Sequence, residues 1–249
     1  MLEGLERLEY RGYDSAGIAV LNDNNLTVCK TTERIKNLIE KTNGGRDIHG
    51  TTGIGHTRWA THGAPSDKNA HPHTSGDGKF AVVHNGIIEN YVTLREELKA
   101  EGVEFKSETD TEVIPQLLAR CYAGDFFEAV AKTVKRLEGS YALGIICTDY
   151  PDTLIAVRKF SPLILGLSDD ANYIASDVTA IVSHTKDIMY IEDGEIAVLS
   201  PCGVKLYDSD KNELHREPAV INWDVSAAEK GGYDHFMMKE IMEQPAAVK

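Results

Sequence analysis

The feature that most restricts the fold of this chain is a series of short apolar segments, joined by turns and interrupted by helices in only two places. In the second half of the chain these segments lie at residues 141–147, 153–157, 163–167 and 173–175. In the first half, residues 17–21 and 26–31 flank a turn. This order is not the strand–helix alternation of a parallel sheet. We therefore expect an α/β chain of the α+β type, with two mainly antiparallel sheets packed face to face and helices outside them.

The spacing of apolar residues also predicts the helices. Leu2, Leu5 and Leu8 predict a helix that begins almost at Met1, and no capping residue precedes it. We interpret this uncapped start as a sign that upstream sequence is missing. Further helices are expected at residues 35–39, 90–101, 113–118 and 126–137.

Local signals predict where several elements begin or turn. Thr109 and Glu112 have the spacing of a capping box, and Asp177 is expected to cap a following helix. Asp193-Gly194 lies between two apolar segments, which predicts a tight hairpin.

We expect residues 1–225 to form one domain. Residues 226–249 open with a polar, glycine-containing stretch that is typical of a linker. Residues 236–242 then begin an apolar helical pattern, which Pro245 is expected to interrupt. These residues are too apolar for a free tail, so they predict an interface with a further part of the protein.

Charge and hydropathy argue against several classes of function. Lys+Arg 26 against Asp+Glu 39 gives a net charge of −13, which repels phosphate backbones, so we expect no nucleic acid partner. No apolar run reaches the roughly 20 residues that cross a bilayer, and no signal peptide is recognisable. The cysteines have no C-x-x-C spacing. We expect a cytoplasmic protein that does not bind membranes.

Polar or glycine-rich clusters follow the apolar elements at residues 11–17, 56–63, 84–86 and 107–110. Asn85-Gly86 has two interpretations. After a strand it is a strong hairpin signal. The residues that follow have helical spacing instead, and between a strand and a helix the pair could present an amide and a backbone N–H as an oxyanion hole.

Arg58 and Asp110 are complementary candidates for ligand binding. Arg58 is either a surface arginine or a planar fork for a carboxylate. Asp110 either belongs to a helix N-terminus or holds an ammonium group. Together they would bind both ends of a free amino acid.

Several histidines raise the question of a metal site; they are His56, His62, His71, His73 and His84. They lack carboxylates or cysteines at convincing ligand spacing. We therefore expect histidines that order loops, and no metal or other cofactor.

The clusters resemble the glutaminase domain of the glutamine–fructose-6-phosphate aminotransferase family. The matching motifs are residues 8–17, 56–63, 69–73, 84–90, 107–112 and 239–245. Amidotransferases that act on phosphoribosyl pyrophosphate share the Arg and Asn-Gly elements, but Trp-Ala-Thr-His-Gly at 59–63 favours the hexosamine enzymes. The resemblance implies a four-layer αββα N-terminal-nucleophile hydrolase fold. It also implies that the whole protein makes glucosamine 6-phosphate and glutamate from fructose 6-phosphate and glutamine, with a sugar-isomerase half and as a homo-oligomer.

The same resemblance implies a glutamine site. Arg58 would bind the α-carboxylate of glutamine and Asp110 its α-ammonium group, while Thr61 and His62 would line the pocket. Trp59 would lie on a loop that closes over glutamine and gates ammonia.

The resemblance implies a catalytic centre as well. Asn85 and the Gly86 N–H would form the oxyanion hole, and Arg11 and Gly12 would lie beside the nucleophile. In this family the nucleophile is an N-terminal cysteine whose own α-amine is the base.

The sequence departs from the family at this nucleophile. Met1 is followed by Leu2, and the cysteines are internal, at Cys29, Cys121, Cys147 and Cys202. None of them has a free α-amine, so the chain as it stands is predicted to be inactive. The alternative is a non-catalytic glutamine-binding or regulatory module.

Overall fold

The computed structural model describes residues 1–222 and 232–248. Its strands are β1 Ser15–Asn22, β2 Asn25–Thr32, β3 Thr52–Arg58, β4 His73–Thr74, β5 Phe80–Ile88, β6 Gly139–Cys147, β7 Tyr150–Lys159, β8 Ile164–Leu167, β9 Asn172–Ala175, β10 Asp187–Tyr190, β11 Ile196–Ser200, β12 Gly203–Tyr207, β13 Glu213–Leu214 and β14 Ala219–Val220. Its helices are α1 Leu2–Leu8, α2 Ile35–Lys41, α3 Tyr91–Ala100, α4 Val113–Cys121, α5 Phe126–Val134 and α7 Phe236–Ala247, with short 3-10 helices η1 Glu9–Arg11 and η2 Val178–Ala180. The bounds of most elements lie close to those that the apolar periodicity predicts.

The described strands form three antiparallel sheets. A seven-stranded sheet has the order β13-β12-β11-β7-β6-β5-β4, a three-stranded sheet the order β2-β1-β3, and a four-stranded sheet the order β14-β10-β8-β9. Each named strand pairs with its neighbours in antiparallel register. The two smaller sheets lie on the same face of the large sheet, so together they make the second β-layer that the sequence predicts.

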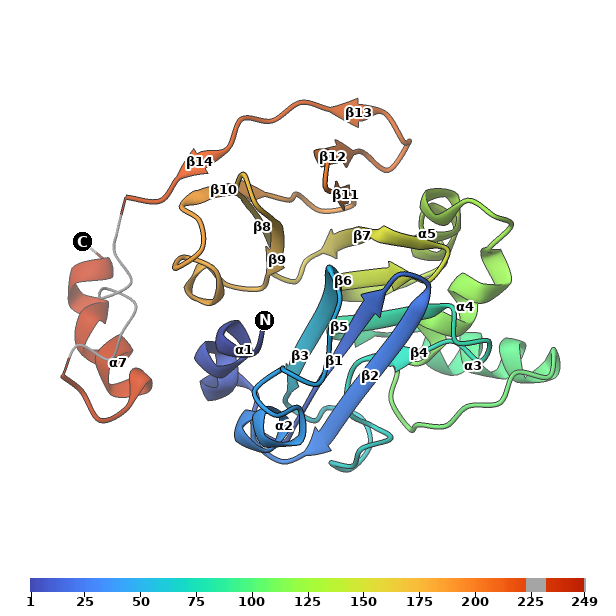
Figure 1. Ribbon diagram of the computed structural model, residues 1–249, viewed down its shortest axis with the longest axis horizontal. Coiled ribbons are helices and arrows are strands. Elements are labelled where there is room, and N and C mark those ends of the chain that lie inside the picture. Colours follow the sequence, from blue (N-terminus) through green and yellow to red (C-terminus); the bar gives the residue numbers. More distant parts are fainter. Residues whose placement is uncertain (223–231, 249) are drawn as a thin grey trace.

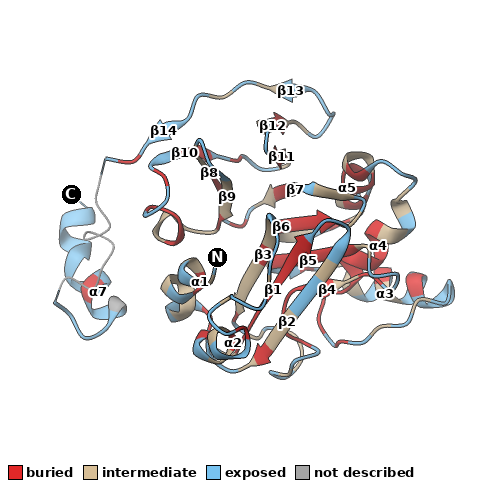
Figure 2. Ribbon diagram, in the orientation of Figure 1, coloured by how far each residue is buried: buried red, intermediate tan, exposed pale blue. Residues whose placement is uncertain are grey.

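Apolar side chains hold four layers together. Leu5 of α1 and Leu38 of α2 pack on the outer face of the three-stranded sheet, against Ile18. The inner face of that sheet packs on β5 and β6. On its other face the large sheet is covered by α3, α4 and α5 (Figure 1). Figure 2 shows the buried residues concentrated in the central strands and the helix faces turned toward them. The predicted αββα layering is confirmed.

The predicted hairpin at Asp193-Gly194 is wrong. The flanking strands β10 and β11 do not pair with each other, because β10 pairs with β8 and β14 while β11 pairs with β7 and β12. Met189 and Leu199 instead meet across the core between two sheets. The Gly194 turn, with φ +86°, therefore links two layers. β10 and β11 bury their apolar faces by stacking across the core rather than by pairing side by side.

The strand that carries Asn85-Gly86 is longer than predicted. β5 continues to Ile88, and Asn85 and Gly86 pair with Ala142 and Tyr141 of β6. The pair is thus neither a hairpin turn nor a strand-to-helix junction. The helical spacing misled the prediction because α3 begins only three residues after β5 ends, at Tyr91.

The predicted capping box does not form. Thr109 does not cap α4, which has Glu112 at its N-cap position without a side-chain capping bond. Glu112 instead accepts hydrogen bonds from the N–H groups of Lys106 and Ser107. Asp177 does cap the turn that follows it, through the Thr179 N–H, but that turn is a single 3-10 turn.

The end of the chain departs from expectation at one point. Pro245 lies inside α7, which continues to Ala247. Residues 226–231, which begin the expected linker, lie outside the described residues. On α7 four apolar side chains are exposed: Met237, Met238, Ile241 and Met242.

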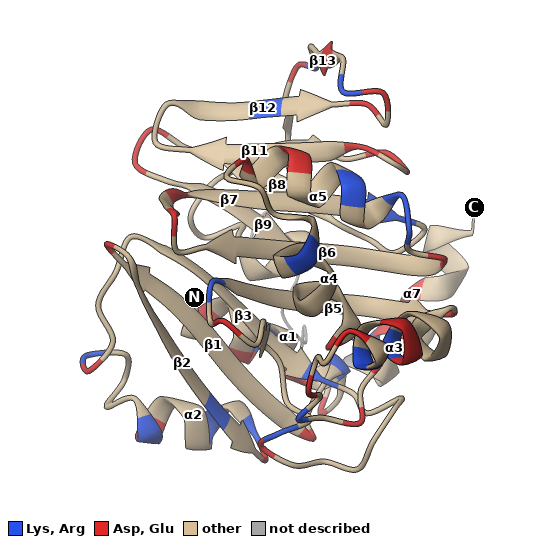
Figure 3. Ribbon diagram, turned by 90° about the vertical axis from the view of Figure 1, so that its right-hand side faces the viewer, with Lys and Arg blue, Asp and Glu red and all other residues tan. Residues whose placement is uncertain are grey.

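Two expectations from the sequence concern nucleic-acid binding and membrane binding. Acidic and basic residues are interspersed over helices and loops, without a basic face in this view (Figure 3). Among the described residues there is no helix with the length and apolar character needed to cross a bilayer.

Candidate functional site

Two cavities meet at one end of β5. The smaller has a volume of about 210 Å³ and the larger about 1160 Å³. They share lining residues from η1, β3 and β5, namely Arg11, His56, Thr57, His84, Asn85 and Gly86. The small cavity is below the roughly 300–1,000 Å³ of drug-sized sites, and so suits a molecule the size of an amino acid.

The small cavity brings together most of the residues predicted for the site. Those that line it are Arg11, Arg58, Trp59, Thr61, Asn85, Gly86 and Asp110. Two predicted residues lie just behind its wall. His62 has Nδ1 3.9 Å from Asp110 Oδ1, and a Cβ on Gly12 would lie 2.6 Å from the Thr57 carbonyl oxygen. Gly12 therefore lets η1 pack closely against β3.

Arg58 is the last residue of β3, and its side chain is buried. Its Nη2 donates to the carbonyl oxygens of His62 and Gly63, which ties the loop after β3 to the guanidinium. Nη1 is buried without a hydrogen bond and lies 3.8 Å from Asp14 Oδ1. Burial lowers the pKa of Arg58, but a guanidinium still stays charged at neutral pH. A guanidinium with one N–H group that makes no hydrogen bond, in a residue that lines the cavity, is suited to bind a carboxylate.

Asp110 supplies the opposite charge to the same cavity. Its side chain is 5% exposed, and its Oδ2 accepts a hydrogen bond from the Ile88 N–H at 2.9 Å. Oδ1 has only long contacts, to Thr111 Oγ1 at 3.5 Å and to His62. One carboxylate oxygen is therefore fixed by backbone while the other is available to a cation.

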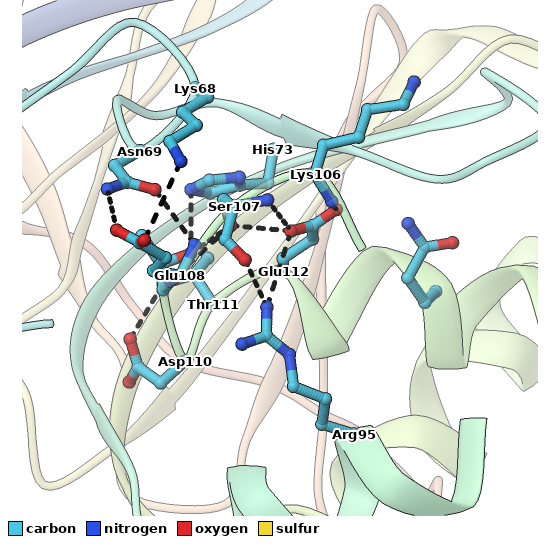
Figure 4. Close-up of polar contacts among 12 residues, drawn as sticks. Lys68, Asn69, His73, Arg95, Lys106, Ser107, Glu108, Asp110, Thr111 and Glu112 are labelled. Carbon is cyan, nitrogen blue, oxygen red and sulfur yellow. Dashed lines mark hydrogen bonds and ion pairs between the residues drawn. The ribbon is translucent and has the colours of Figure 1, made fainter. Parts of the chain in front are cut away.

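A polar network holds the loop that carries Asp110 (Figure 4). Asn69 donates to Glu108 Oε2 and accepts from the Glu108 N–H, at 3.2 and 2.9 Å. Arg95 donates to the Ser107 carbonyl and lies 3.8 Å from Glu112. This loop is thus positioned by side chains from two other segments, so Asp110 keeps its place without regular secondary structure.

Asn85 and Gly86 lie where the two cavities join. Asn85 Oδ1 is 2.7 Å from His56 Nε2. Gly86 has φ +129°, and a Cβ there would lie 2.1 Å from the Ser140 carbonyl oxygen. Only glycine fits this backbone position, which lets β5 bend open beside the cavities while it stays paired with β6.

Trp59 follows Arg58 directly and is 60% exposed. Its ring meets the edge of Tyr13, with 5.4 Å between centroids. The next residue, Ala60, donates its N–H to Asp14 Oδ2. Asp14 therefore links the buried guanidinium of Arg58 to the first turn of the Trp59 loop.

Sequence reasoning assigned no role to Asp14 or Asn69, and it assigned Glu112 only to a capping box. Asp14 lies inside the cluster 11–17, and Asn69 and Glu112 lie inside motifs quoted for the family. An acidic or amide side chain in a glycine-rich cluster was the available signal. The partners of Asp14 and Asn69 lie 46 and 39 residues away, and no local pattern reveals them: Ala60 for Asp14 and Glu108 for Asn69.

The histidines stack on one another beneath the cavities. His71 stacks on His56 with ring centroids 4.4 Å apart and on His84 at 6.4 Å, and it meets the edge of His73. Burial lowers the pKa of His71 and of His73 well below the usual value. Within the described part of the chain no cluster has the arrangement of a metal site. The rings pack as neutral, flat side chains that order the loop before β4.

The large cavity is a slot between two unpaired strand edges. Within the described residues β3 pairs only with β1, and β9 pairs only with β8. Residues of β3 and β9 line opposite sides, β5 and β6 form the floor, and α1 and η2 contribute Leu5 and Ala180 to the lining. Strand edges that face a cavity have backbone N–H and C=O groups available to a further strand.

The family of the chain follows from comparison with known proteins. The profile of the family described as "Glutamine amidotransferase domain" matches residues 56–183. This region contains the end of β3 from His56, the Trp59 loop, β5 and the Asp110 loop, which build the small cavity. The chain belongs to the glutamine amidotransferase domain family.

Curated relatives show which glutamine amidotransferases the chain resembles. A "Glutamine--fructose-6-phosphate aminotransferase [isomerizing]" from Clostridium acetobutylicum is 57% identical over the whole chain, which spans 41% of that relative. A protein of the same name from Aquifex aeolicus is 55% identical over 248 residues, and the chain spans 42% of it. The resemblance to this enzyme family is confirmed, and the chain covers about two-fifths of the length of these relatives.

Solved structures agree on the fold. A glutamine phosphoribosylpyrophosphate amidotransferase from B. subtilis, complexed with ADP and GMP, superposes with a TM-score of 0.73 at 27% identity, covering 85% of this chain and 46% of that one. A glutamine aminotransferase class-II domain protein from Silicibacter pomeroyi matches with a TM-score of 0.55 at 14% identity, over 79% of this chain and 96% of that one, which speaks for the fold alone. The predicted N-terminal-nucleophile hydrolase fold is confirmed.

Proposed function

We propose that this chain binds glutamine in the small cavity and is the glutamine-hydrolysing part of an aminotransferase that makes glucosamine 6-phosphate from fructose 6-phosphate. One observation carries the proposal. Arg58, whose Nη1 makes no hydrogen bond, and Asp110 line one cavity together with Asn85-Gly86. A cavity with one buried cation and one buried anion fits a zwitterionic amino acid.

The residues have definite roles in this proposal. Arg58 binds the α-carboxylate of glutamine, and Asp110 binds the α-ammonium group beside Thr61 and His62. The side-chain amide then points toward Asn85, where the small cavity opens into the slot. The Asn85 amide and the Gly86 N–H stabilise the oxyanion that forms at the amide carbonyl. Trp59 covers the entrance, and Arg11 and Gly12 lie beside the nucleophile.

The slot supports a proposal for the nucleophile. A β-strand that enters between β3 and β9 would pair with both edges and end beside Asn85-Gly86. In the proposed reaction, the thiol of an N-terminal cysteine on that strand attacks the amide carbon while its own α-amine accepts the thiol proton. The amine returns the proton to the leaving ammonia, and water then hydrolyses the thioester to glutamate. An α-amine suits this role because its pKa is about 7.7–8.0.

A direct test of the glutamine site uses calorimetric titration with glutamine. Arg58→Ala should weaken affinity by about 100-fold or more, since losing one partner of an enclosed charged hydrogen bond costs several kcal/mol. Arg46→Ala is the matched control, because Arg46 is exposed and outside both cavities. Unchanged affinity of the Arg58 variant would remove Arg58 from the site.

The slot and the nucleophile are tested with three proteins: the 249-residue chain, the chain preceded by Met-Cys-Gly-Ile-Val-Gly, and the same extension with Ser in place of Cys. Both extensions should raise the melting temperature, because each aliphatic side chain that enters the slot contributes roughly 1.5–3 kcal/mol. Only the cysteine protein should release glutamate. Equal glutamate release by the unextended chain would refute the role of the strand. A cysteine protein that binds glutamine but releases none would support a binding or regulatory module instead.

The exposed apolar side chains of α7 support a partner proposal. Met237, Met238, Ile241 and Met242 would dock on a sugar-isomerase half in the complete, homo-oligomeric, cytoplasmic protein, which would need no cofactor for glutamine hydrolysis. Deleting residues 236–249 should weaken reassociation with a separately expressed isomerase half. If reassociation and solubility were unchanged, α7 would have no part in that interface.

A further inference from the structure

One hydrogen bond at the junction of the two cavities is not explained by glutamine binding. His56 of β3 has Nε2 2.7 Å from Asn85 Oδ1 of β5. The two strands belong to different sheets, the three-stranded and the seven-stranded sheet. This contact therefore links the layers at the position where the proposed oxyanion would form.

The contact defines which end of the Asn85 amide faces the cavity. A carbonyl oxygen can only accept, so the hydrogen lies on His56 Nε2 and the imidazole donates. The Nδ2 group then points away from His56. Among the described residues Nδ2 has no hydrogen-bond partner, and Asn85 lines both cavities. The two N–H donors of the amide are thus available to a reacting atom.

The surroundings of His56 keep it in this form. Burial lowers the pKa of His56 to about 4, which keeps the ring neutral at working pH. A neutral imidazole has a single N–H, and His56 Nδ1 is buried without a hydrogen bond, as fits an unprotonated nitrogen. The ring also stacks on His71, whose Nδ1 in turn accepts the His84 N–H at 3.3 Å. The stack covers one face of the His56 ring and so restricts its plane.

We propose that His56 is a positioning residue for glutamine hydrolysis: its Nε2–H holds the Asn85 carbonyl so that the Asn85 amide presents its N–H groups to the oxyanion. This rests on the proposed function, since it assigns a role within that site. His56 touches neither end of the amino acid in this scheme. Its removal should therefore impair the chemical step and leave glutamine binding intact.

The kinetic test uses the full-length protein with its cysteine-bearing strand. His56→Leu removes the donor and leaves the Asn85 amide free to turn over, so kcat for glutamate release should fall about 10- to 100-fold, as for a misplaced catalytic group. The KM for glutamine should change by less than about threefold, the signature of an interaction made only in the transition state. His56→Gln, whose amide N–H reaches a similar point, should recover at least about tenfold of the loss.

A double-mutant cycle separates positioning from general structural damage. If His56 acts only through Asn85, adding His56→Leu to Asn85→Ala should lower kcat by less than about twofold. Independent, multiplicative losses would overturn the proposal. So would a His56→Leu protein with the kcat of the unaltered protein, or one in which His56→Gln gives no recovery.

A second measurement does not depend on activity. The ¹⁵N spectrum of the labelled 249-residue chain, with His56 assigned by the signals lost in His56→Leu, should show the Nε2–H tautomer at pH 7. An Nδ1–H tautomer or a doubly protonated ring would overturn the proposal. If the full-length protein released no glutamate at all, the proposed function would fail, and this spectrum would still decide whether His56 holds Asn85.

Discussion

Removing the carboxylate of Asp14 should both destabilise the chain and weaken the proposed glutamine site. Oδ1 accepts from Ser15 Oγ at 2.9 Å and lies 3.8 Å from Arg58 Nη1, while Oδ2 accepts from the Ala60 N–H. Asp14→Ala would leave Arg58, which is 5% exposed in its side chain, without its nearest countercharge. Deleting one partner of a buried pair costs about 3–5 kcal/mol.

The expected loss of stability depends on solvent screening and on which residue replaces Asp14. The Asp14 side chain is 16% exposed, so water screens part of the interaction and the lower end, about 3 kcal/mol, is expected for Asp14→Ala. Asp14→Asn keeps one oxygen for the Ala60 N–H, and should cost about 2 kcal/mol through the lost charge.

The assay is urea denaturation of the wild type and the variants, followed by glutamine titration. Asp210→Ala is the control, because Asp210 is exposed and its side chain has no hydrogen bond or ion pair among the described residues; it should change stability by less than about 0.5 kcal/mol. Asp14→Ala should also reduce glutamine affinity, since Arg58 and the Trp59 loop lose their shared anchor. If Asp14→Ala matched Asp210→Ala in both measurements, the link between the η1–β1 turn and the site would be refuted.

Three further predictions follow from the site. Burial lowers the pKa of His71 and His73, so as pH falls the unfolded chain binds protons before the native chain does. The free energy of unfolding should therefore fall as pH drops below about 6.5, by up to about 1.4 kcal/mol per pH unit for each histidine. Denaturation midpoints at pH 7.5 and 5 check this, and a midpoint that stayed constant would contradict it. Gly86→Ala places a Cβ 2.1 Å from a backbone oxygen and should lower the free energy of unfolding by about 3 kcal/mol or more. Gly78 also has a positive φ, but a Cβ there would meet nothing within 4 Å. Thermal melts should therefore show a loss of only about 1 kcal/mol for Gly78→Ala. Asn69→Ala should weaken glutamine binding by about 1–2 kcal/mol in calorimetry, which is more than it should lower the free energy of unfolding, because it frees the Glu108 segment of the Asp110 loop. A loss of stability with unchanged glutamine affinity would mean that the loop keeps its shape without Asn69.

The layers of the fold could be predicted because they depend on local apolar patterning. β6 is apolar over most of its length and β7 over residues 154–157, so these short apolar runs are enough to place both strands. The errors arose where long-range partners decide. At Gly194 the two flanking strands bury their faces against different sheets, and no local signal reports which partner a strand will choose.

The candidate site was predictable to a different degree. Arg58 and Asp110 were found because opposite charges in two polar clusters suggest a ligand, and the family motifs gave them roles. Glu112 was assigned to a helix cap from its spacing, yet its carboxylate turns back to the Lys106 and Ser107 N–H groups. Asp14 and His56 act on residues in other segments, at 46 and 29 positions along the chain. Contacts between residues so far apart in the sequence depend on how the sheets and helices pack on one another. The spacing of apolar residues does not contain that information.

The slot between β3 and β9 also affects how this chain should behave in concentrated solution. An open strand edge on a protein surface acts as a template for aggregation, because each added strand exposes a new edge to the next. Here both edges face the same cavity, with the large sheet beneath and α1 and η2 lining it. A strand that enters meets a pairing partner on each side and leaves no edge exposed. The geometry therefore limits association to one inserted segment per molecule, and growth of an intermolecular sheet through these edges is blocked.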